Sequence, residues 1–192
     1  MGRKRFRQSG YSAVELLIVM SVLVVLSTVA VLGWRGTNQA FLATAGMDDV
    51  VGQLRTARQL AISERRSIEI AFNGPNQIQL TPETTTGAQV APNPFAPVTL
   101  SSGVQFLYFG TGDTPMAFGT CGVVCLVAAG AAPVAPVHFV SNGSLTDNNN
   151  NFVNGTVFLG LPNQKGTARA VTILGATGRV RPYYWDGAKW NE

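Results

Sequence analysis

An uncharged run near the N terminus dominates the pattern of apolar and polar positions. The chain has 192 residues, and the nineteen residues from Leu16 to Trp34 include no charged side chain. At ~1.5 Å rise per residue, a helix of this length measures roughly 30 Å, which is the thickness of the hydrocarbon core of a bilayer. The run therefore predicts a transmembrane helix.

Helical spacing continues beyond this run. Between residues 37 and 66 apolar side chains recur near helical spacing, with arginines between them. We expect one long helix from about Ser12 to about Ser63, its first half in lipid and its second half amphipathic. A bend or local melt is expected at Gly33–Gly36, because glycine weakens helices. The apolar positions are Phe41, Ala45, Val50, Leu54, Ala57, Leu60 and Ala61.

Beyond Ser67 the hydrophobic period changes to two, in short runs bounded by Gly, Pro and Asn. The expected fold class is α+β, with the long helix packed on an antiparallel, β-sandwich-like domain. Mobile polar loops are expected at Pro82–Pro97 and Asp147–Asn151. The predicted strands are Ser67–Phe72, Gln77–Thr81, Val98–Ser101, Val104–Phe109, Val137–Val140, Thr156–Leu161, Arg169–Leu174 and Gly178–Tyr184.

The charge distribution indicates topology more than a nucleic-acid partner. The net charge is +4 and the pI about 9.4, values that by themselves suggest an anionic partner. However, four of the fourteen basic residues lie in the first seven positions. This excess places the N-terminal flank in the cytoplasm and the part after Trp34 across the membrane. Residues 1–10 hold no acidic residue, so the remaining chain carries ten basic and ten acidic side chains.

Glu15 is an ionisable residue just inside the apolar run. A charge at a helix centre in a bilayer costs on the order of 3 kcal/mol, and less near a helix end, so such a residue needs a partner. Gly10 and Tyr11 stand between the basic stretch and the run. A cut between them would create an α-amino group four residues before Glu15, and the two opposite charges could then neutralise each other between neighbouring copies.

Residues 10–19, with Gly10, Tyr11 and Glu15 in register, resemble the processing site of type IV pilins and type II secretion pseudopilins. Tyr11 replaces the usual Phe. The resemblance implies that a prepilin peptidase cuts after Gly10 and methylates the amine of Tyr11. It also implies that Glu15 guides docking into a helical filament of pilins or pseudopilins.

Residues 57–70 add a second resemblance, to the minor pseudopilin family called GspH/FimT. The implied organisation is a leader peptide at 1–10, a transmembrane helix at 11–35, an amphipathic continuation at 36–66 and an extracytoplasmic β domain at 67–192. The implied location is the bacterial inner membrane, with a single pass, a cytoplasmic N terminus and a periplasmic β domain. The implied function is that of a minor subunit of a type IV pilus or a type II secretion pseudopilus. The residues do not separate secretion, pilus and competence systems.

An ordinary secretory signal peptide is the alternative. Thr28-Val29-Ala30 resembles a small-residue cleavage site behind a basic and then apolar stretch. Glu15 argues against it, because a charge would fall inside the apolar region of the signal.

The two cysteines, Cys121 and Cys125, enclose three residues. Outside the cytoplasm they are candidates for a local disulfide, with two buried free thiols as the alternative. A redox catalyst more typically has two intervening residues.

No catalytic constellation stands out. His138 is the single histidine and alternates with apolar neighbours in Val137–Val140, which is typical of a structural or surface position. No phosphate loop, paired carboxylates or His/Cys metal cluster accompanies it. We expect neither an enzyme nor a cofactor, a metal or a small-molecule substrate.

The C-terminal part has a local excess of positive charge, interleaved with aromatic residues. This composition suits binding of single-stranded nucleic acid. Ala176–Arg181 is similar to an element of FimT-type members linked to DNA uptake, and that resemblance makes Gly178, Arg179 and Arg181 candidates for DNA contact. The alternative is a charged edge strand or a contact with another subunit. The basic residues concerned are Lys165, Arg169, Arg179, Arg181 and Lys189.

Overall fold

The computed structural model describes residues 12–84, 87–100, 103–110, 124–128 and 136–192. The chain divides into two units, Met1–Asn38 and Gln39–Glu192. One helix, α1 (Ala13–Glu64), runs through both. The expected long helix is therefore confirmed to within one residue at each end. The local melt expected at Gly33–Gly36 is wrong, because the backbone there stays helical.

The first unit exposes its apolar side chains on every side of α1. Each described apolar residue from Val14 to Leu26 has more than half of its side-chain surface exposed. Among the residues that the structure describes, no helix combines the length and apolarity needed to cross a membrane.

In the second unit, α1 has one buried stripe. The buried residues recur at intervals of three or four, which matches the expected amphipathic half. Phe41 and Ala45 depart from the expectation, since both are exposed, Phe41 at 69%. The stripe consists of Ala43, Met47, Val50, Leu54, Ala57 and Ala61.

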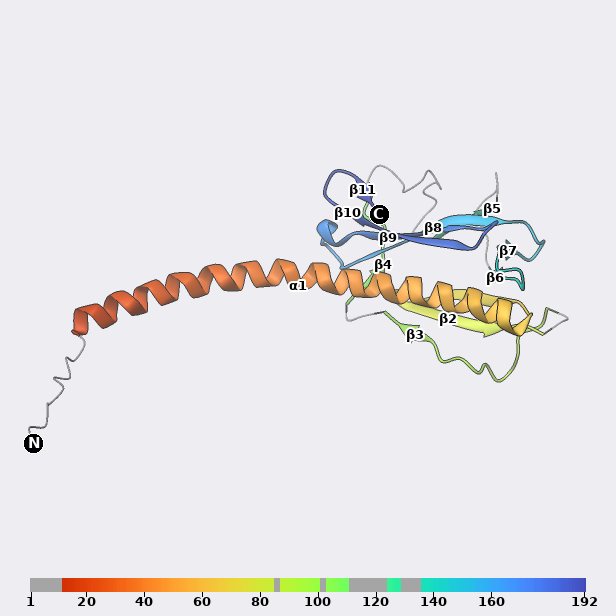
Figure 1. Cartoon of the computed structure of the whole chain (residues 1–192), viewed down its shortest axis with the longest axis horizontal. Coiled ribbons are helices and arrows are strands. Elements are labelled where there is room, and N and C mark those ends of the chain that lie inside the picture. Colours follow the sequence, from red (N-terminus) through yellow and green to blue (C-terminus); the bar gives the residue numbers. More distant parts are fainter. Residues whose placement is uncertain (1–11, 85–86, 101–102, 111–123, 129–135) are drawn as a thin grey trace, which may run out of the picture. The chain divides into compact units, whose positions relative to one another are not determined.

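Two antiparallel sheets complete the second unit (Figure 1). The first sheet has the strand order β3-β2-β1-β6-β7, and the second has the order β11-β10-β9-β8-β4, with β5 also paired to β8. The strands of the first sheet are β1 (Ile68–Asn73), β2 (Gln77–Pro82), β3 (Val98–Thr99), β6 (Val137–Phe139) and β7 (Leu145–Asp147). Those of the second are β4 (Gln105–Phe106), β5 (Val124–Ala128), β8 (Val153–Gly160), β9 (Arg169–Leu174), β10 (Arg179–Trp185) and β11 (Trp190–Asn191), and a short 3-10 helix, η2 (Lys165–Thr167), precedes β9.

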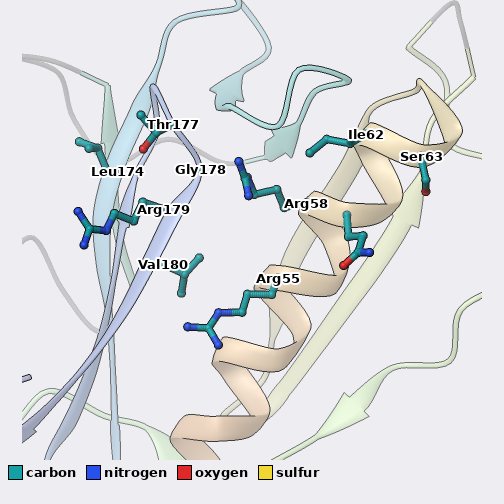
Figure 2. A pocket seen from close by; sticks show the side chains of 10 residues that line it. Arg55, Arg58, Ile62, Ser63, Leu174, Thr177, Gly178, Arg179 and Val180 are labelled. Carbon is teal, nitrogen blue, oxygen red and sulfur yellow. The ribbon is translucent and has the colours of Figure 1, made fainter.

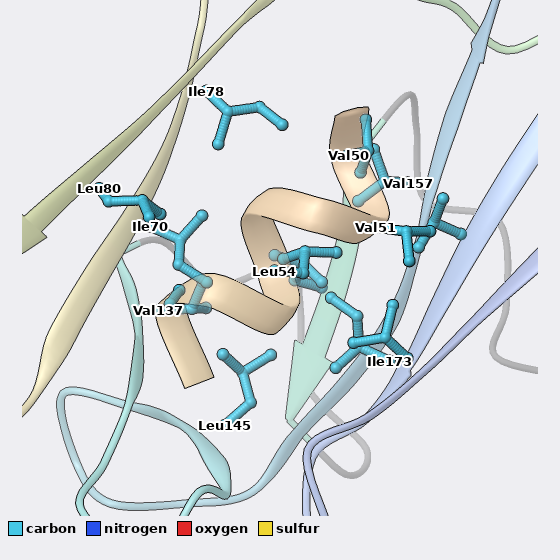
Figure 3. Packing of buried hydrophobic residues seen from close by; sticks show 14 of the residues in the cluster. Val50, Val51, Leu54, Ile70, Ile78, Leu80, Val137, Leu145, Val157 and Ile173 are labelled. Atoms are coloured by element: carbon cyan, nitrogen blue, oxygen red, sulfur yellow. The ribbon is translucent and has the colours of Figure 1, made fainter. Parts of the chain in front are cut away.

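The C-terminal half of α1 lies between the two sheets. Figure 3 shows Leu54 with Ile70 and Val137 of the first sheet on one side and Ile173 of the second sheet on the other. All four belong to a single hydrophobic cluster. The expected packing of the helix on antiparallel sheets is thus confirmed, and the helix covers the inner faces of both sheets.

Both polar segments expected as loops carry defined hydrogen bonds. Asn93 Nδ2 donates to the carbonyl of Leu80 at 2.8 Å, so the segment after β2 folds back over that strand. Asp147 Oδ1 accepts hydrogen bonds from the backbone N–H groups of Asn149 and Asn151, both at 2.8 Å. Hydrogen bonding by Asn151 lowers the pKa of the Asp147 carboxyl.

Candidate functional site

The residues of the expected processing site lie at the start of the chain. Gly10 and Tyr11 fall outside the described residues. Glu15 is in the first turn of α1, and its side chain is exposed. A carboxylate in the first turn interacts favourably with the unpaired N–H groups of the helix.

A pocket of about 880 Å³ lies between α1 and the turn that joins β9 to β10 (Figure 2). We call it the arginine pocket, since Arg55 and Arg58 of α1 and Arg179 of β10 line it. In Figure 2 the Arg58 side chain extends toward Gly178, whereas that of Arg179 points away from α1. The remaining lining residues are Gln59, Ile62, Ser63, Leu174, Thr177, Gly178 and Val180.

Gly178 has a structural reason to be glycine. Its φ is +61°, and a Cβ atom there would lie 2.0 Å from the carbonyl oxygen of Gly143 and 2.7 Å from Arg58 Nε. Arg58 Nε donates a hydrogen bond to that same Gly143 carbonyl at 3.1 Å. Gly178 therefore allows three segments to meet: α1, the β6–β7 turn and the β9–β10 turn.

The two candidate arginines of β10 differ in their surroundings. Arg179 is exposed, whereas the guanidinium of Arg181 donates to the Glu192 carboxylate at 2.8 Å. They are two residues apart in one strand, so they share a face, opposite the buried Val180. The structure thus brings Gly178 and Arg179 to the pocket and pairs Arg181 with the C-terminal residue.

Arg169, counted in the C-terminal positive excess, is buried. Its guanidinium donates to the carbonyl of Ala168 at 2.9 Å and to the hydroxyl of Thr44 on α1 at 3.3 Å. Burial lowers the pKa of this side chain. Arg169 therefore attaches β9 to the helix and does not face solvent.

The aromatic side chains near the C terminus pack largely against the protein itself. Tyr183 is buried with Phe158, and the ring of Trp190 lies 5.4 Å from Trp185 and 6.0 Å from Phe158, measured between centroids. Tyr184 is 44% exposed and remains accessible to a stacking partner.

A second polar group surrounds His138 on the first sheet. His138 Nδ1 lies 2.9 Å from Glu83 Oε1, and both side chains are buried. Burial raises the pKa of the Glu83 carboxyl, and the charge of His138 acts in the opposite direction. Glu69, on β1, lies beside them. The sequence did not lead us to expect carboxylates around His138. The available signal was that both Ile68-Glu69-Ile70 and Val137-His138-Phe139 alternate apolar and polar residues.

Cys125 is buried in β5 and takes part in a disulfide. Cys121, its predicted partner, lies outside the described residues.

No model of a known protein family matches the sequence, and no curated protein matches it. Among solved structures, the chain is similar to the minor pseudopilin EpsH of the type 2 secretion system of Vibrio cholerae. That pair has 14% identity and a TM-score of 0.47, and the match covers 74% of this chain and 96% of EpsH. A second EpsH structure gives 13% identity, a TM-score of 0.47 and coverages of 73% and 92%. The type IV minor pilin FimU of Pseudomonas aeruginosa is similar at 15% identity and a TM-score of 0.47, with coverages of 78% and 92%.

Proposed function

We propose that this chain is a pilin-like subunit that assembles with other pilins or pseudopilins into a type IV pilus or a type II secretion pseudopilus. A prepilin peptidase would cut after Gly10 and methylate Tyr11. The apolar part of α1 would anchor the subunit in the bacterial inner membrane before assembly, with the β domain in the periplasm.

The observation that carries this proposal is that α1 is apolar on all sides in the first unit and has one acidic residue, Glu15, in its first turn. Side chains from Val14 to Leu26 are exposed around the whole helix, with Leu17 at 70%. A helix that is apolar on all sides needs an apolar environment. Lipid would supply this environment before assembly, and the equivalent helices of neighbouring subunits would supply it afterwards.

Glu15 gives the assembly its expected specificity. Inside an apolar bundle, an unpaired carboxylate is costly, whereas a carboxylate beside an α-amino group is neutralised. The amine created by cleavage after Gly10 is the opposite charge available at the same depth. Pairing between subunits would therefore favour one axial register.

The test compares Glu15→Ala with Asp48→Ala, which removes an exposed acid elsewhere on the same helix. We expect mass spectrometry to find a methylated Tyr11 at the mature N terminus in both variants. Glu15→Ala should remain in the membrane fraction, while Asp48→Ala enters the sheared filament fraction. Normal incorporation of Glu15→Ala would contradict the proposal, and a mature N terminus near Ala30 would support an ordinary signal peptide instead.

A second candidate function is DNA binding by the same subunit, as in FimT-type members. It is supported by the two guanidinium groups of α1, Arg55 and Arg58, which line the arginine pocket together with Arg179, because guanidinium groups suit phosphates. The alternative explanation for Gly178 is packing, as described above.

Mobility-shift assays at several salt concentrations would test this second function. We expect Arg179→Gln combined with Arg55→Gln to weaken binding and to reduce its salt dependence. Arg65→Gln, which removes an exposed arginine outside the arginine pocket, is the control. Absence of DNA binding at low salt, or equal binding by all variants, would contradict a DNA-binding function of the arginine pocket.

A further inference from the structure

The outer face of the first sheet carries a row of polar side chains. In the strand register Thr81 of β2 is opposite Glu69 of β1, Glu69 is opposite His138 of β6, and His138 is opposite Thr146 of β7. The inner face at neighbouring positions is apolar, with Ile68, Ile70 and Phe139 buried. Glu83 follows β2 by one residue, and its backbone N–H donates to Ser67 at 2.9 Å, so it stays beside β1.

Three side chains of this face bring metal-ligand atoms together. One carboxylate oxygen each from Glu69 and Glu83 and one ring nitrogen of His138 lie within 4.8 Å of one another. Glu83 and His138 are 8% and 6% exposed. Two carboxylates this close repel each other unless a positive charge lies between them, and the burial of Glu83 adds to the cost of its charge.

The orientation of the imidazole leaves one nitrogen available. Nε2 lies 2.5 Å from Asn148 Oδ1, and in the tautomer with its proton on Nε2 the ring donates to that oxygen. Nδ1 then faces the carboxylates. It is buried and lies 2.9 Å from Glu83 Oε1, with which it forms an ion pair when the ring is protonated. When the ring is neutral with its proton on Nε2, Nδ1 carries no proton and its lone pair can bind a metal ion.

We propose that Glu69, Glu83 and His138 bind a divalent transition-metal ion, with zinc as the best fit. One imidazole nitrogen and two carboxylate oxygens form a donor set that zinc accepts, whereas magnesium and calcium prefer oxygen alone. Asn148 acts as a positioning residue, because a ligating histidine commonly donates its second N–H to a fixed oxygen. The hydroxyl of Thr146, buried and without a hydrogen bond, is available to a water on the metal.

The surroundings are compatible with a cation. Glu83 and His138 line a polar pocket of about 710 Å³, which gives an ion a path from solvent. The two arginines that also line it are Arg65, which is exposed, and Arg66, which pairs with Glu64. Gln89 Nε2 donates to Glu69 Oε2 at 2.8 Å, so the second oxygen of Glu69 remains for the metal. A bound ion would join β1, β6 and the segment after β2.

The test uses the full chain in detergent, without an affinity tag, and zinc chloride as the probe. Calorimetry should give one ion per chain, and zinc should raise the melting temperature. Cobalt(II) should give the visible absorption of a low-coordinate site, and X-ray absorption of the zinc complex should show one imidazole with oxygen ligands. Absence of stoichiometric binding to the unaltered chain would overturn the proposal without any variant.

Variants assign the ligands. Glu83→Gln and His138→Gln should each weaken zinc binding by more than about a hundredfold, and Asn148→Ala by about ten- to a hundredfold. Asp48→Asn, an exposed acid on α1, should bind as the unaltered chain does. Near-UV circular dichroism without metal shows whether each variant is folded. If a ligand variant fails to fold, the absorption spectra of the unaltered chain decide. Unchanged affinity in folded Glu83→Gln and His138→Gln would overturn the proposal.

Discussion

Gly178 combines a left-handed backbone with a site that has no room for a side chain. Gly178→Ala would place Cβ against the Gly143 carbonyl and force a left-handed backbone on a residue with a side chain. The backbone cost is about 1 kcal/mol and overpacking adds about 1–3 kcal/mol. We therefore expect the free energy of unfolding to fall by more than about 2 kcal/mol in urea titrations.

Gly74→Ala separates the two effects. Gly74 has a φ of +58°, but no atom lies within 4 Å of its added Cβ. This variant should lose only the backbone contribution, about 1 kcal/mol. Equal losses at Gly74 and Gly178 would mean that the contact with Gly143 does not limit the side chain.

For single residues, the sequence predicted the kind of side chain at the candidate site better than the place of that side chain in the fold. Arg179 and Arg181 share a strand face as their spacing requires, but no local pattern indicates that Arg181 pairs with Glu192 or that Arg169 is buried under α1. Arg55 and Arg58 were expected only as the polar face of a helix. Their meeting with Gly178 depends on segments far apart in the chain.

The turn between β10 and β11 depends on one carboxylate. Asp186 Oδ1 accepts hydrogen bonds from the backbone N–H groups of Ala188 and Lys189, each at 2.8 Å, and Oδ2 accepts one from Asn191. The backbone hydrogen bonds, that of Lys189 first, lower the pKa of Asp186 to about 2. The folded state therefore favours the ionised form.

The consequence is a loss of hairpin stability in acid. Because the pKa of Asp186 is depressed from its ordinary 3.8 to about 2, the contribution is complete above the ordinary value and is lost as the pH falls toward 2. The near-UV signal of the Trp185–Trp190 pair should change in that window. Asp186→Asn should show the acid-form signal already at neutral pH. An identical titration in both proteins would contradict this assignment.

The longer strands were largely predicted and the short strands β3, β4 and β6 lie within predicted segments, but β5, β7 and β11 were missed. β9 has the predicted bounds, and β2 differs by one residue. β5 is apolar throughout and shows no period of two, while β7 and β11 span only three and two residues. Such strands form because they pair with the edge of a neighbouring strand, and the local sequence does not indicate which strand that is.

Substitution of Leu54 would test how far the stability of the two sheets depends on packing against α1. It is fully buried between them, so Leu54→Ala leaves a cavity bordered by both sheets. We expect a loss of about 2–5 kcal/mol, with a single unfolding transition followed by tryptophan fluorescence. Phe41→Ala, at a position 69% exposed, should change stability by about 0.5 kcal/mol or less. Two separate transitions in Leu54→Ala would mean that the sheets unfold independently.

The layered arrangement of the second unit could be predicted only in part. Period-two runs identify which face of each strand is apolar, and the helical stripe identifies the buried side of α1. Neither pattern shows that one helix packs against two sheets. A buried position such as Val50 or Leu54 has the same sequence pattern whether it contacts one sheet or two.

The unbroken helix also has a mechanical consequence. Within the second unit α1 packs against both sheets, so tension applied along that part of the helix would act on the centre of the core. Drawing the helix out along its axis would slide Leu54 and its neighbours past two sheets at once, so many contacts would have to shear together. A helix lying on the surface could instead be peeled off one turn at a time. We therefore expect the domain to resist axial pulling more strongly than a domain with a surface helix.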